Sequence, residues 1–268
     1  MAEMIARRQF DPLYIWLDLG FLLFFACLLL LRKKYMTVLT GLLAGLLYMV
    51  VDFGIFHLVC GAREISGGYS LFWVLLWMSM SYGFTNFAWI WLWISKDHRL
   101  LEWSMLILTW WFCCPLITRT FGGGLEPITI QRTTGSYHGY MALILLVGYL
   151  GLIVWNLWQK EQETRAPILW LLAIGILVQL GWEAMLLVGG VRSAGFSSLA
   201  DKLSPLLVNS LLETNLGMPY IYVIFILYSS RRTEGLRRRS DRLTCLARIR
   251  ELNGRRVRDV PSDGGYFA

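Results

Sequence analysis

Four carboxylic acids lie inside long apolar segments of the sequence: Asp18, Asp52, Glu183 and Glu213. Placing an ionisable side chain at the centre of a membrane-spanning helix costs about 3 kcal/mol, so each acid needs a partner or a wet cavity. Carboxyl groups that meet away from water disfavour one another's charge, and one or more of them can then keep a proton near pH 7. Such an acid can couple the movement of a ligand to that of a proton, or it can protonate a substrate.

The spacing of the four acids predicts that they lie at one level of the membrane. At a rise of about 1.5 Å per residue, each lies roughly 20–22 Å from the cytoplasmic end of its helix. We therefore expect them to converge on a shared polar cavity. Asp18 is close enough to a helix end to reach the interface, which favours a structural role, and Asp52 could instead be a packing acid bonded to Tyr48. The candidate catalytic residues are Asp52, Glu183 and Glu213.

Six further residues are candidates for binding a substrate. They comprise two amides and two aromatic rings near the level of the acids, and two arginines expected on the outer loops: Asn86, Asn215, Trp182, Tyr220, Arg63 and Arg192. Aromatic faces attract apolar or cationic groups, and outer arginines could form a basic vestibule for an anionic ligand. The simpler alternatives are helix packing for the aromatic side chains and anchoring at the membrane interface for the arginines.

The composition predicts that membrane-spanning helices hold these residues. Of the 268 residues, 56% are hydrophobic and only 16% are charged, whereas a soluble domain carries about a quarter charged residues. A spanning helix needs about 20 apolar residues. Seven segments qualify: 13–31, 38–60, 71–94, 101–118, 139–158, 168–190 and 206–228. We therefore predict an all-α, multi-pass membrane protein with seven transmembrane helices in residues 1–230.

The basic charge is concentrated in a C-terminal tail. Residues 231–268 hold eleven arginines and five acids, so the first 230 residues contribute only +1 to the net charge of +7. The loops at 32–36, 96–100 and 159–167 carry seven positive residues, and the opposite side also carries seven. The tail therefore decides the orientation, which we predict as a cytoplasmic C-terminus and an N-terminus outside. Charge beside a last span indicates retention in the cytoplasm rather than nucleic-acid binding, and the expected partners are the lipid bilayer and a small-molecule ligand.

A pattern shared by the two halves predicts an internal repeat. Asp52 is followed after 34 residues by Asn86, and Glu183 is followed after 32 residues by Asn215. Beyond the acids the two halves read Gly61-Ala62-Arg63 and Gly190-Val191-Arg192. This pattern favours a 3+1+3 arrangement in which the first three and the last three spans are parallel repeats, as in some transporters. Chance similarity between apolar segments is the alternative.

Several motifs that announce enzymes are missing from the sequence. It contains no His-Glu-x-x-His, no Gly-x-Ser-x-Gly, no Cys-x-x-Cys and no paired aspartates of the kind that bind magnesium–diphosphate. The five cysteines show no metal-ligand spacing. We therefore expect no metal and no cofactor, and any chemistry is left to the carboxylic acids.

One short stretch carries a family resemblance. Asn86-Phe87-Ala88-Trp89 resembles a motif of the small seven-helix membrane terpene cyclases of fungal meroterpenoid and indole-diterpene pathways. The resemblance implies a compact membrane enzyme that protonates an epoxide or alkene with buried acids. In the family pattern a glutamate follows the tryptophan, whereas Ile90 stands there in this chain. A Trp-Glu pair occurs instead as Trp182-Glu183, and Glu213 would supply a second acid.

Three hypotheses of function follow. The first is a small-molecule transporter in which Asp52, Glu183 and Glu213 bind substrate or a proton, and it predicts two-fold pseudo-symmetry with a cavity closed on one side. The second is a membrane-embedded cyclase or isomerase acting on a lipid-like substrate, and it predicts a pocket open sideways to lipid with one acid facing it. The third is a receptor or assembly protein, in which the acids pair off and merely join helices. The sequence favours the transporter slightly and makes no prediction of oligomeric state.

Overall fold

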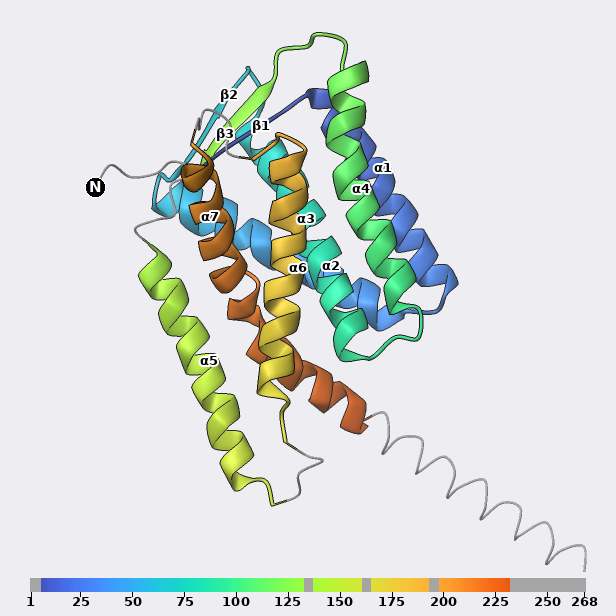
Figure 1. The fold of residues 1–268 in the computed structure, drawn as a ribbon, viewed down its shortest axis with the longest axis vertical. Coiled ribbons are helices and arrows are strands. Elements are labelled where there is room, and N and C mark those ends of the chain that lie inside the picture. Colours follow the sequence, from blue (N-terminus) through green and yellow to red (C-terminus); the bar gives the residue numbers. More distant parts are fainter. Residues whose placement is uncertain (1–5, 133–136, 161–164, 193–197, 232–268) are drawn as a thin grey trace, which may run out of the picture. The chain divides into compact units, whose positions relative to one another are not determined.

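The computed structural model of the chain describes residues 6–132, 137–160, 165–192 and 198–231 (Figure 1). The chain divides into two compact units, residues 1–220 and residues 221–268. The described residues are predominantly helical, which confirms the predicted all-α class. The predicted basic tail lies outside the described residues, apart from Arg231.

The helices follow the predicted segments closely. They are α1 (Pro12–Leu31), α2 (Tyr35–Met49) with its π-helical continuation η1 (Val50–Val59), α3 (Leu71–Ile94), α4 (Leu100–Phe121), α5 (His138–Trp158), α6 (Ile168–Val188), α7 (Leu199–Leu212) and the short 3-10 helix η4 (Asn215–Gly217). Residues 218–231 are helical again. The predicted span 206–228 is thus interrupted by a turn and a 3-10 segment, with Glu213 at the point where α7 ends.

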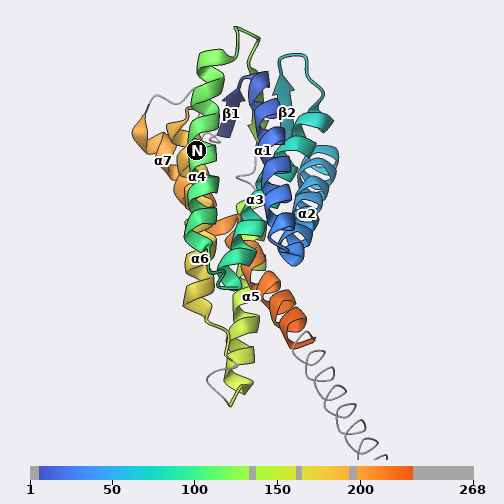
Figure 2. The same ribbon diagram turned by 90° about the vertical axis from the view of Figure 1, so that its right-hand side faces the viewer.

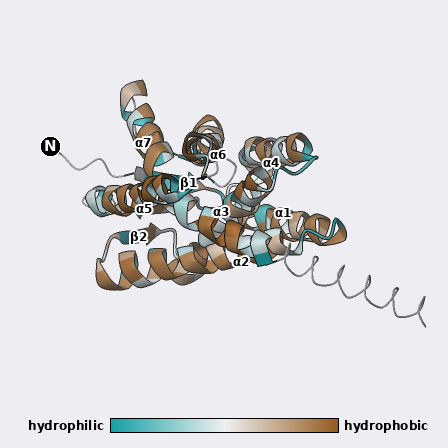
Figure 3. Cartoon of the chain, turned by 90° about the horizontal axis from the view of Figure 1, so that it is seen from below, coloured by the Kyte–Doolittle hydropathy of each residue, from teal (hydrophilic) through white to brown (hydrophobic). Residues whose placement is uncertain are grey.

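Six helical stretches are long and apolar enough to cross a membrane: Pro12–Leu31, Tyr35–Val59, Leu100–Phe121, His138–Trp158, Ile168–Val188 and Leu199–Arg231. They expose large apolar side chains such as Leu47, Leu157 and Trp158, and hydrophobic residues run along most of the helical surface (Figure 3). A soluble protein rarely exposes contiguous apolar surface of this extent. The chain is therefore an integral, multi-pass membrane protein.

The predicted span 71–94 forms α3 but is not among these six stretches. Eighteen of its 24 residues are buried, because α3 packs against α1, α2, α4 and α6. A helix that faces protein on most sides tolerates hydroxyl, amide and aromatic side chains, such as Ser79, Tyr82 and Asn86, which lower its hydropathy. The predicted count of seven spans therefore depends on α3. Its packing against the other helices, rather than its hydropathy, places it in the bundle.

Helices α2 and α3 approach closely through glycines. A Cβ atom added to Gly83 would lie 2.6 Å from the Cα of Gly45, and one added to Gly41 would lie 2.9 Å from the carbonyl oxygen of Phe84. Small residues allow this approach in membrane bundles, where dispersion contacts drive association. The contact also brings two phenols together, since the Tyr48 hydroxyl lies 3.3 Å from that of Tyr82.

A small antiparallel sheet, which the sequence analysis did not anticipate, lies at one end of the helices (Figures 1 and 2). Its strands are β1 (Ala6–Phe10), β2 (Arg63–Ser66) and β3 (Ile128–Arg132), in the order β1-β3-β2. A bridge between Arg8 and Arg192 adds the segment that follows α6. The sheet therefore ties together the chain that precedes α1 and the chain that follows η1, α4 and α6.

An ion pair joins two helix connections outside the spans. The carboxylate of Asp97, between α3 and α4, pairs with the ammonium group of Lys34, between α1 and α2, and its side chain is only 2% exposed. It also accepts a hydrogen bond from the backbone N–H of Arg99 at 2.9 Å. Burial alone would raise the pKa of Asp97, but the hydrogen bond and charge of Lys34 and the Arg99 N–H outweigh burial and hold the pKa below its usual value.

We expect this lowered pKa to make part of the stability depend on pH. The contribution is complete above about pH 4, the usual pKa of a free aspartate, and is lost as the pH falls through the lower pKa of the folded protein. Asp97→Asn is expected to lower the melting temperature in detergent by about 2–4 °C at pH 7, or about 1 kcal/mol, and this difference should shrink toward pH 3. Glu102→Gln removes a carboxylate whose side chain is 69% exposed and serves as the control. A difference between wild type and Asp97→Asn that stayed constant down to pH 3 would contradict this assignment.

Candidate functional site

Asp18 joins three helices through the indoles of two tryptophans. Its carboxylate accepts hydrogen bonds from Trp77 Nε1 of α3 at 3.0 Å and from Trp110 Nε1 of α4 at 2.9 Å. The side chain is buried, with 1% of the residue exposed. Two charge-assisted hydrogen bonds of this kind hold a carboxylate in one position, in keeping with the structural role that the sequence favours for Asp18.

Asp52 forms a buried ion pair with the strand that follows its own helix. The carboxylate lies in the π-helical segment η1, and Arg63 Nη2 of β2 donates to its Oδ1 at 2.8 Å. The guanidinium of Arg63 also lies over the ring of Phe56, 4.5 Å from its centroid. The hydroxyl of Tyr48, the alternative partner considered from the sequence, lies 3.3 Å from that of Tyr82.

Glu183 of α6 lies between two arginines. Arg192 Nη1 donates to Oε1 at 2.9 Å and lies 2.6 Å from Oε2, while Arg8 Nη2 lies 3.6 Å from Oε1. Glu183 is completely buried, and both arginines are at most 5% exposed. Arg63 and Arg192 therefore turn inward to carboxylates, in contrast to the open basic vestibule considered from the sequence.

The two acid–arginine pairs resemble each other locally. In each half a helix carries the acid, a glycine with positive φ reverses the chain after the helix, and an arginine two residues later returns to the acid. The glycines are Gly61, with φ of 61°, and Gly190, with φ of 74°. This backbone region favours glycine because a Cβ atom would strain it. The likeness accounts for the sequence match between the halves, and the full 3+1+3 repeat stays a prediction.

Glu213 has a different environment from the other three acids. It is half-buried at the end of α7. Its Oε2 accepts from Gln179 Nε2 at 3.0 Å and lies 3.4 Å from the Tyr82 hydroxyl, whose proton is directed to Gln179 Oε1. Both neighbours are neutral groups. Among the described residues no lysine, arginine or histidine forms an ion pair with Glu213. Its protonation therefore breaks no ion pair of the described chain.

Gln179 links Glu213 to Glu183 and was not recognised from the sequence. Its Nε2 lies 3.3 Å from Glu183 Oε1 as well as 3.0 Å from Glu213 Oε2. Its Oε1 accepts from the Tyr82 hydroxyl at 2.8 Å and from the Thr214 hydroxyl. The spacing of four residues between Gln179 and Glu183 places both on one helix face, which is the signal that could have identified it.

The structure thus brings two of the four acids into one hydrogen-bonded network. Glu183 and Glu213 meet through Gln179, while Asp18 and Asp52 lie in separate sets of contacts. The shared cavity expected for all four acids gives way to three distinct polar centres. At each centre the carboxylates bond to side chains from other parts of the chain.

The remaining candidate binding residues occupy diverse positions. Asn86 is fully buried, and neither its amide nitrogen nor its amide oxygen has a hydrogen-bond partner among the described residues. Asn215 is packed against α6, where a Cβ atom on Gly175 would lie 2.2 Å from its side-chain oxygen. Tyr220 is 44% exposed and donates to the carbonyl oxygen of Ile144 at 3.0 Å, away from the acids.

Aromatic rings surround the Tyr82 side of the network. The ring of Trp182 lies 5.7 Å from that of Tyr82 and 4.7 Å from that of Trp111, measured between centroids. Tyr48 lies 4.7 Å from Tyr82 in an edge-on arrangement. These rings present electron-rich faces, which attract positive charge. Trp182 and Trp111 therefore lie beside the Glu183–Gln179–Glu213 network on its Tyr82 side, and binding of a substrate by Trp182 stays a prediction.

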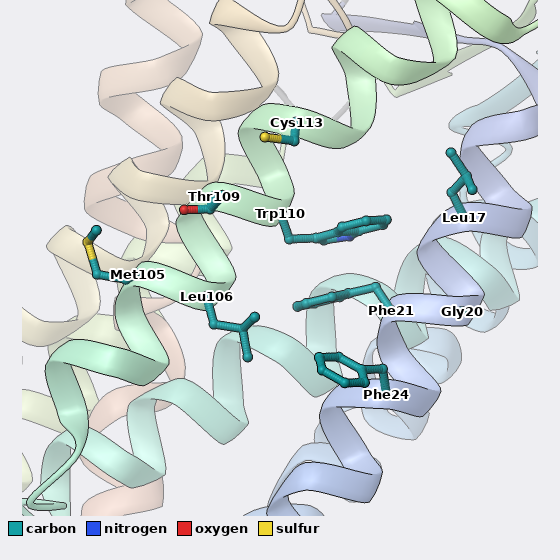
Figure 4. A pocket seen from close by; sticks show the side chains of 9 residues that line it. All are labelled: Leu17, Gly20, Phe21, Phe24, Met105, Leu106, Thr109, Trp110 and Cys113. Carbon is teal, nitrogen blue, oxygen red and sulfur yellow. The ribbon is translucent and has the colours of Figure 1, made fainter.

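A separate apolar groove runs between α1 and α4 (Figure 4). Its volume is about 650 Å³, and the stacked rings of Phe21 and Trp110, 4.7 Å apart, form part of its wall. None of the four acids lines the groove, although Trp110, which does, donates a hydrogen bond to the carboxylate of Asp18. The groove is of a size that suits a small ligand, and its lining suits a hydrocarbon.

Within the described segments no group of three or more histidine, cysteine, aspartate or glutamate side chains is arranged to hold a metal ion. Comparisons with protein-family models, with curated proteins and with solved structures find no match to this chain. The residues of the site are therefore the basis for a functional interpretation.

We expect the Glu183 ion pairs to be essential for stability. Arg192→Met would leave a fully buried carboxylate without its closest counter-charge, and breaking a buried pair in this way costs about 3–5 kcal/mol. The double variant Glu183→Gln with Arg192→Met is expected to recover only part of this loss, because no charge is stranded at Glu183 but the buried guanidinium of Arg8 loses this carboxylate. Arg165→Met, at an exposed position, is the control. Thermal unfolding in detergent measures all four proteins, and equal melting temperatures for Arg192→Met and Arg165→Met would contradict the assignment.

Proposed function

We propose that this protein is a membrane-embedded enzyme that uses Glu213 as an acid on an apolar, lipid-like substrate, as a cyclase or isomerase does. The observation that carries the proposal is the contrast between Glu213 and the other acids. Asp52 and Glu183 are neutralised by arginines and Asp18 is fixed by two indoles, whereas Glu213 is half-buried and, among the described residues, contacts only neutral polar side chains, those of Gln179 and Tyr82.

The proposed chemistry is a proton transfer to carbon or oxygen. Protonated Glu213 donates its proton to an alkene or epoxide of the substrate, and the positive charge that forms passes to a carbon atom. The carboxylate left behind is stabilised by the Gln179 amide, which already donates to Glu213 before the reaction. Loss of a proton from the cationic intermediate to the Glu213 carboxylate completes the reaction and restores the acid for the next turnover.

The aromatic rings and the helix break support this chemistry. The faces of Tyr82, Trp182 and Trp111 stabilise a developing cation. Irregular backbone such as the turn after Leu212 is tolerated within a membrane segment where it is buried in protein or lines a cavity. The resemblance of Asn86-Phe87-Ala88-Trp89 to the membrane terpene cyclases points to the same class of reaction.

A small-molecule transporter is the second candidate. The interrupted helix at 213–217 and the likeness of the two acid–glycine–arginine segments favour it, because transporters combine broken helices with internal repeats. We rank it second because the two arginine-paired acids are already neutralised within the chain. A receptor or assembly protein would use the same ion pairs only to join its segments, and would not require the uncompensated Glu213.

Replacing Glu213 tests these candidates directly. Metabolites inside and outside cells are compared for wild type, Glu213→Gln and the exposed control Glu102→Gln at equal protein levels. We expect one product to depend on Glu213, and its formation to fall by at least 100-fold in Glu213→Gln, the usual contribution of a general acid. A compound that is merely redistributed across the membrane would identify a transporter. An unchanged inventory and distribution would overturn the enzyme and the transporter proposals together.

We further propose that all seven predicted segments span the membrane, with the N-terminus outside and the C-terminus in the cytoplasm. Strands β2 and β3 pair with each other, so they lie on one side of the membrane and an even number of crossings separates them. Helix α4 is one candidate crossing, and α3 is the other helix between the strands. The buried helix α3 then crosses in spite of its lower hydropathy.

Cysteine labelling tests this topology. In a background without the five native cysteines, Glu64→Cys and Glu126→Cys lie at exposed positions near β2 and β3, and His98→Cys lies between α3 and α4. We expect a membrane-impermeant maleimide added to intact cells to label the first two variants and not the third. Labelling of all three from outside would show that α3 does not cross.

A further inference from the structure

A small cavity lies beside the Arg8–Glu183 ion pair. It has a volume of about 20 Å³, and all nine residues that line it are buried. Four of them bring polar groups that could face a ligand: Arg8 from β1, Tyr14 from α1, Ser81 from α3 and Trp182 from α6. One water molecule occupies about 10–15 Å³, so the cavity is large enough to hold a water.

Three polar atoms at this cavity require a partner. The hydroxyl oxygens of Tyr14 and Ser81 and the indole nitrogen of Trp182 are buried and form no hydrogen bond with any described residue. The Ser81 hydroxyl lies beside the carboxylate of Asp18 but does not meet hydrogen-bond geometry. Buried polar groups are almost always satisfied by protein or by ordered water, so the three atoms together point to a ligand that hydrogen-bonds.

We propose that this cavity binds one structural water molecule. The water accepts a hydrogen bond from Trp182 Nε1 and donates its two protons to the hydroxyl oxygens of Tyr14 and Ser81. Three hydrogen bonds are the usual number for a buried water. Because the three groups belong to α1, α3 and α6, the water fixes these helices to one another next to the Glu183 centre.

A water is distinguished from an anion by its neutrality. The guanidinium of Arg8 lines the cavity and lies 3.6 Å from the carboxylate of Glu183, which also pairs with Arg192. A neutral ligand leaves the Arg8–Glu183 pair undisturbed, whereas an anion would compete with Glu183 for Arg8. The water site is independent of the proposed enzyme activity, since it rests on the cavity and its lining alone.

The direction in which the melting temperature changes when a hydroxyl group is removed tests whether the cavity holds a water. Removing a hydroxyl that bonds a water destabilises the protein, whereas removing one that has no partner stabilises it. In chloride-free buffer we expect Tyr14→Phe and Ser81→Ala each to lower the melting temperature of the full chain in detergent by about 2–4 °C. Ser79→Ala is the matched control, because Ser79 is on the same helix, equally buried, without a described partner and outside the cavity lining. If both cavity variants raise the melting temperature as the control does, the cavity is dry and the proposal fails.

A double-variant cycle tests whether one ligand bridges the two hydroxyls, which do not bond each other. Tyr14→Phe combined with Ser81→Ala should lower the melting temperature by less than the sum of the single effects, because the same water is lost only once. Tyr14→Phe combined with Ser79→Ala should be additive. Additivity in both pairs would overturn the bridging water. If the cavity variants lost stability only when chloride was present, the ligand would be an anion and the water assignment would be wrong.

Discussion

The ion pairs of Glu183 with Arg192 and Arg8 are the interaction on which the rest of the site depends. A carboxylate that is fully buried has to be compensated inside the chain, since neither lipid nor bulk water reaches it. This requirement draws the segment after α6 back onto its helix and brings β1 to the same place, where Arg8 and Arg192 also form a backbone bridge. Once Glu183 is fixed, Gln179 is fixed one helical turn earlier, and its amide can reach Glu213.

This arrangement divides the four acids by role. Asp18, Asp52 and Glu183 use their charge to hold elements together, and their oxygen atoms are occupied by indoles or guanidinium groups. Glu213 lies where the backbone of the last predicted span is irregular, and the described polar groups that approach it are neutral. A carboxyl group in that setting can gain or lose a proton without breaking an ion pair, which is the property that either acid catalysis or proton coupling needs.

The sequence predicted the helical elements well because their signal is strong and local. Six predicted segments coincide with long apolar helices, and the seventh, 71–94, is helical from Leu71 to Ile94. The sequence identified the four acids in apolar segments but did not predict which side chains bond to them. The pairing of Asp52 with Arg63 depends on the reversal at Gly61, and the role of Gln179 depends on how α6 faces α7. The acids do not come together as their predicted common depth in the membrane suggested, because residues at one depth can point to different sides of a bundle.

The small sheet escaped the sequence analysis for a related reason. Its strands are four or five residues long, contain arginines, and acquire their pairing from segments that are far apart in the chain. Helices announce themselves through local composition, whereas these strands exist because the ends of α1, η1, α4 and α6 come together. Asp52 and Glu183 are both paired with arginines of this sheet, since Arg63 belongs to β2 and Arg8 to β1.

The order of the strands has a consequence for biosynthesis. Strand β1 is made before the other described elements, yet its partner β3 begins 118 residues after β1 ends, at Ile128. At a translation rate of about 5–20 residues per second, the first strand waits roughly 6–24 s for its partner. During that interval β1 presents unpaired backbone groups, and the arginine that it carries toward Glu183 waits longer still, because α6 follows later. The segment that carries β1 is therefore among the last of the described parts to reach its final place, although it is made before them.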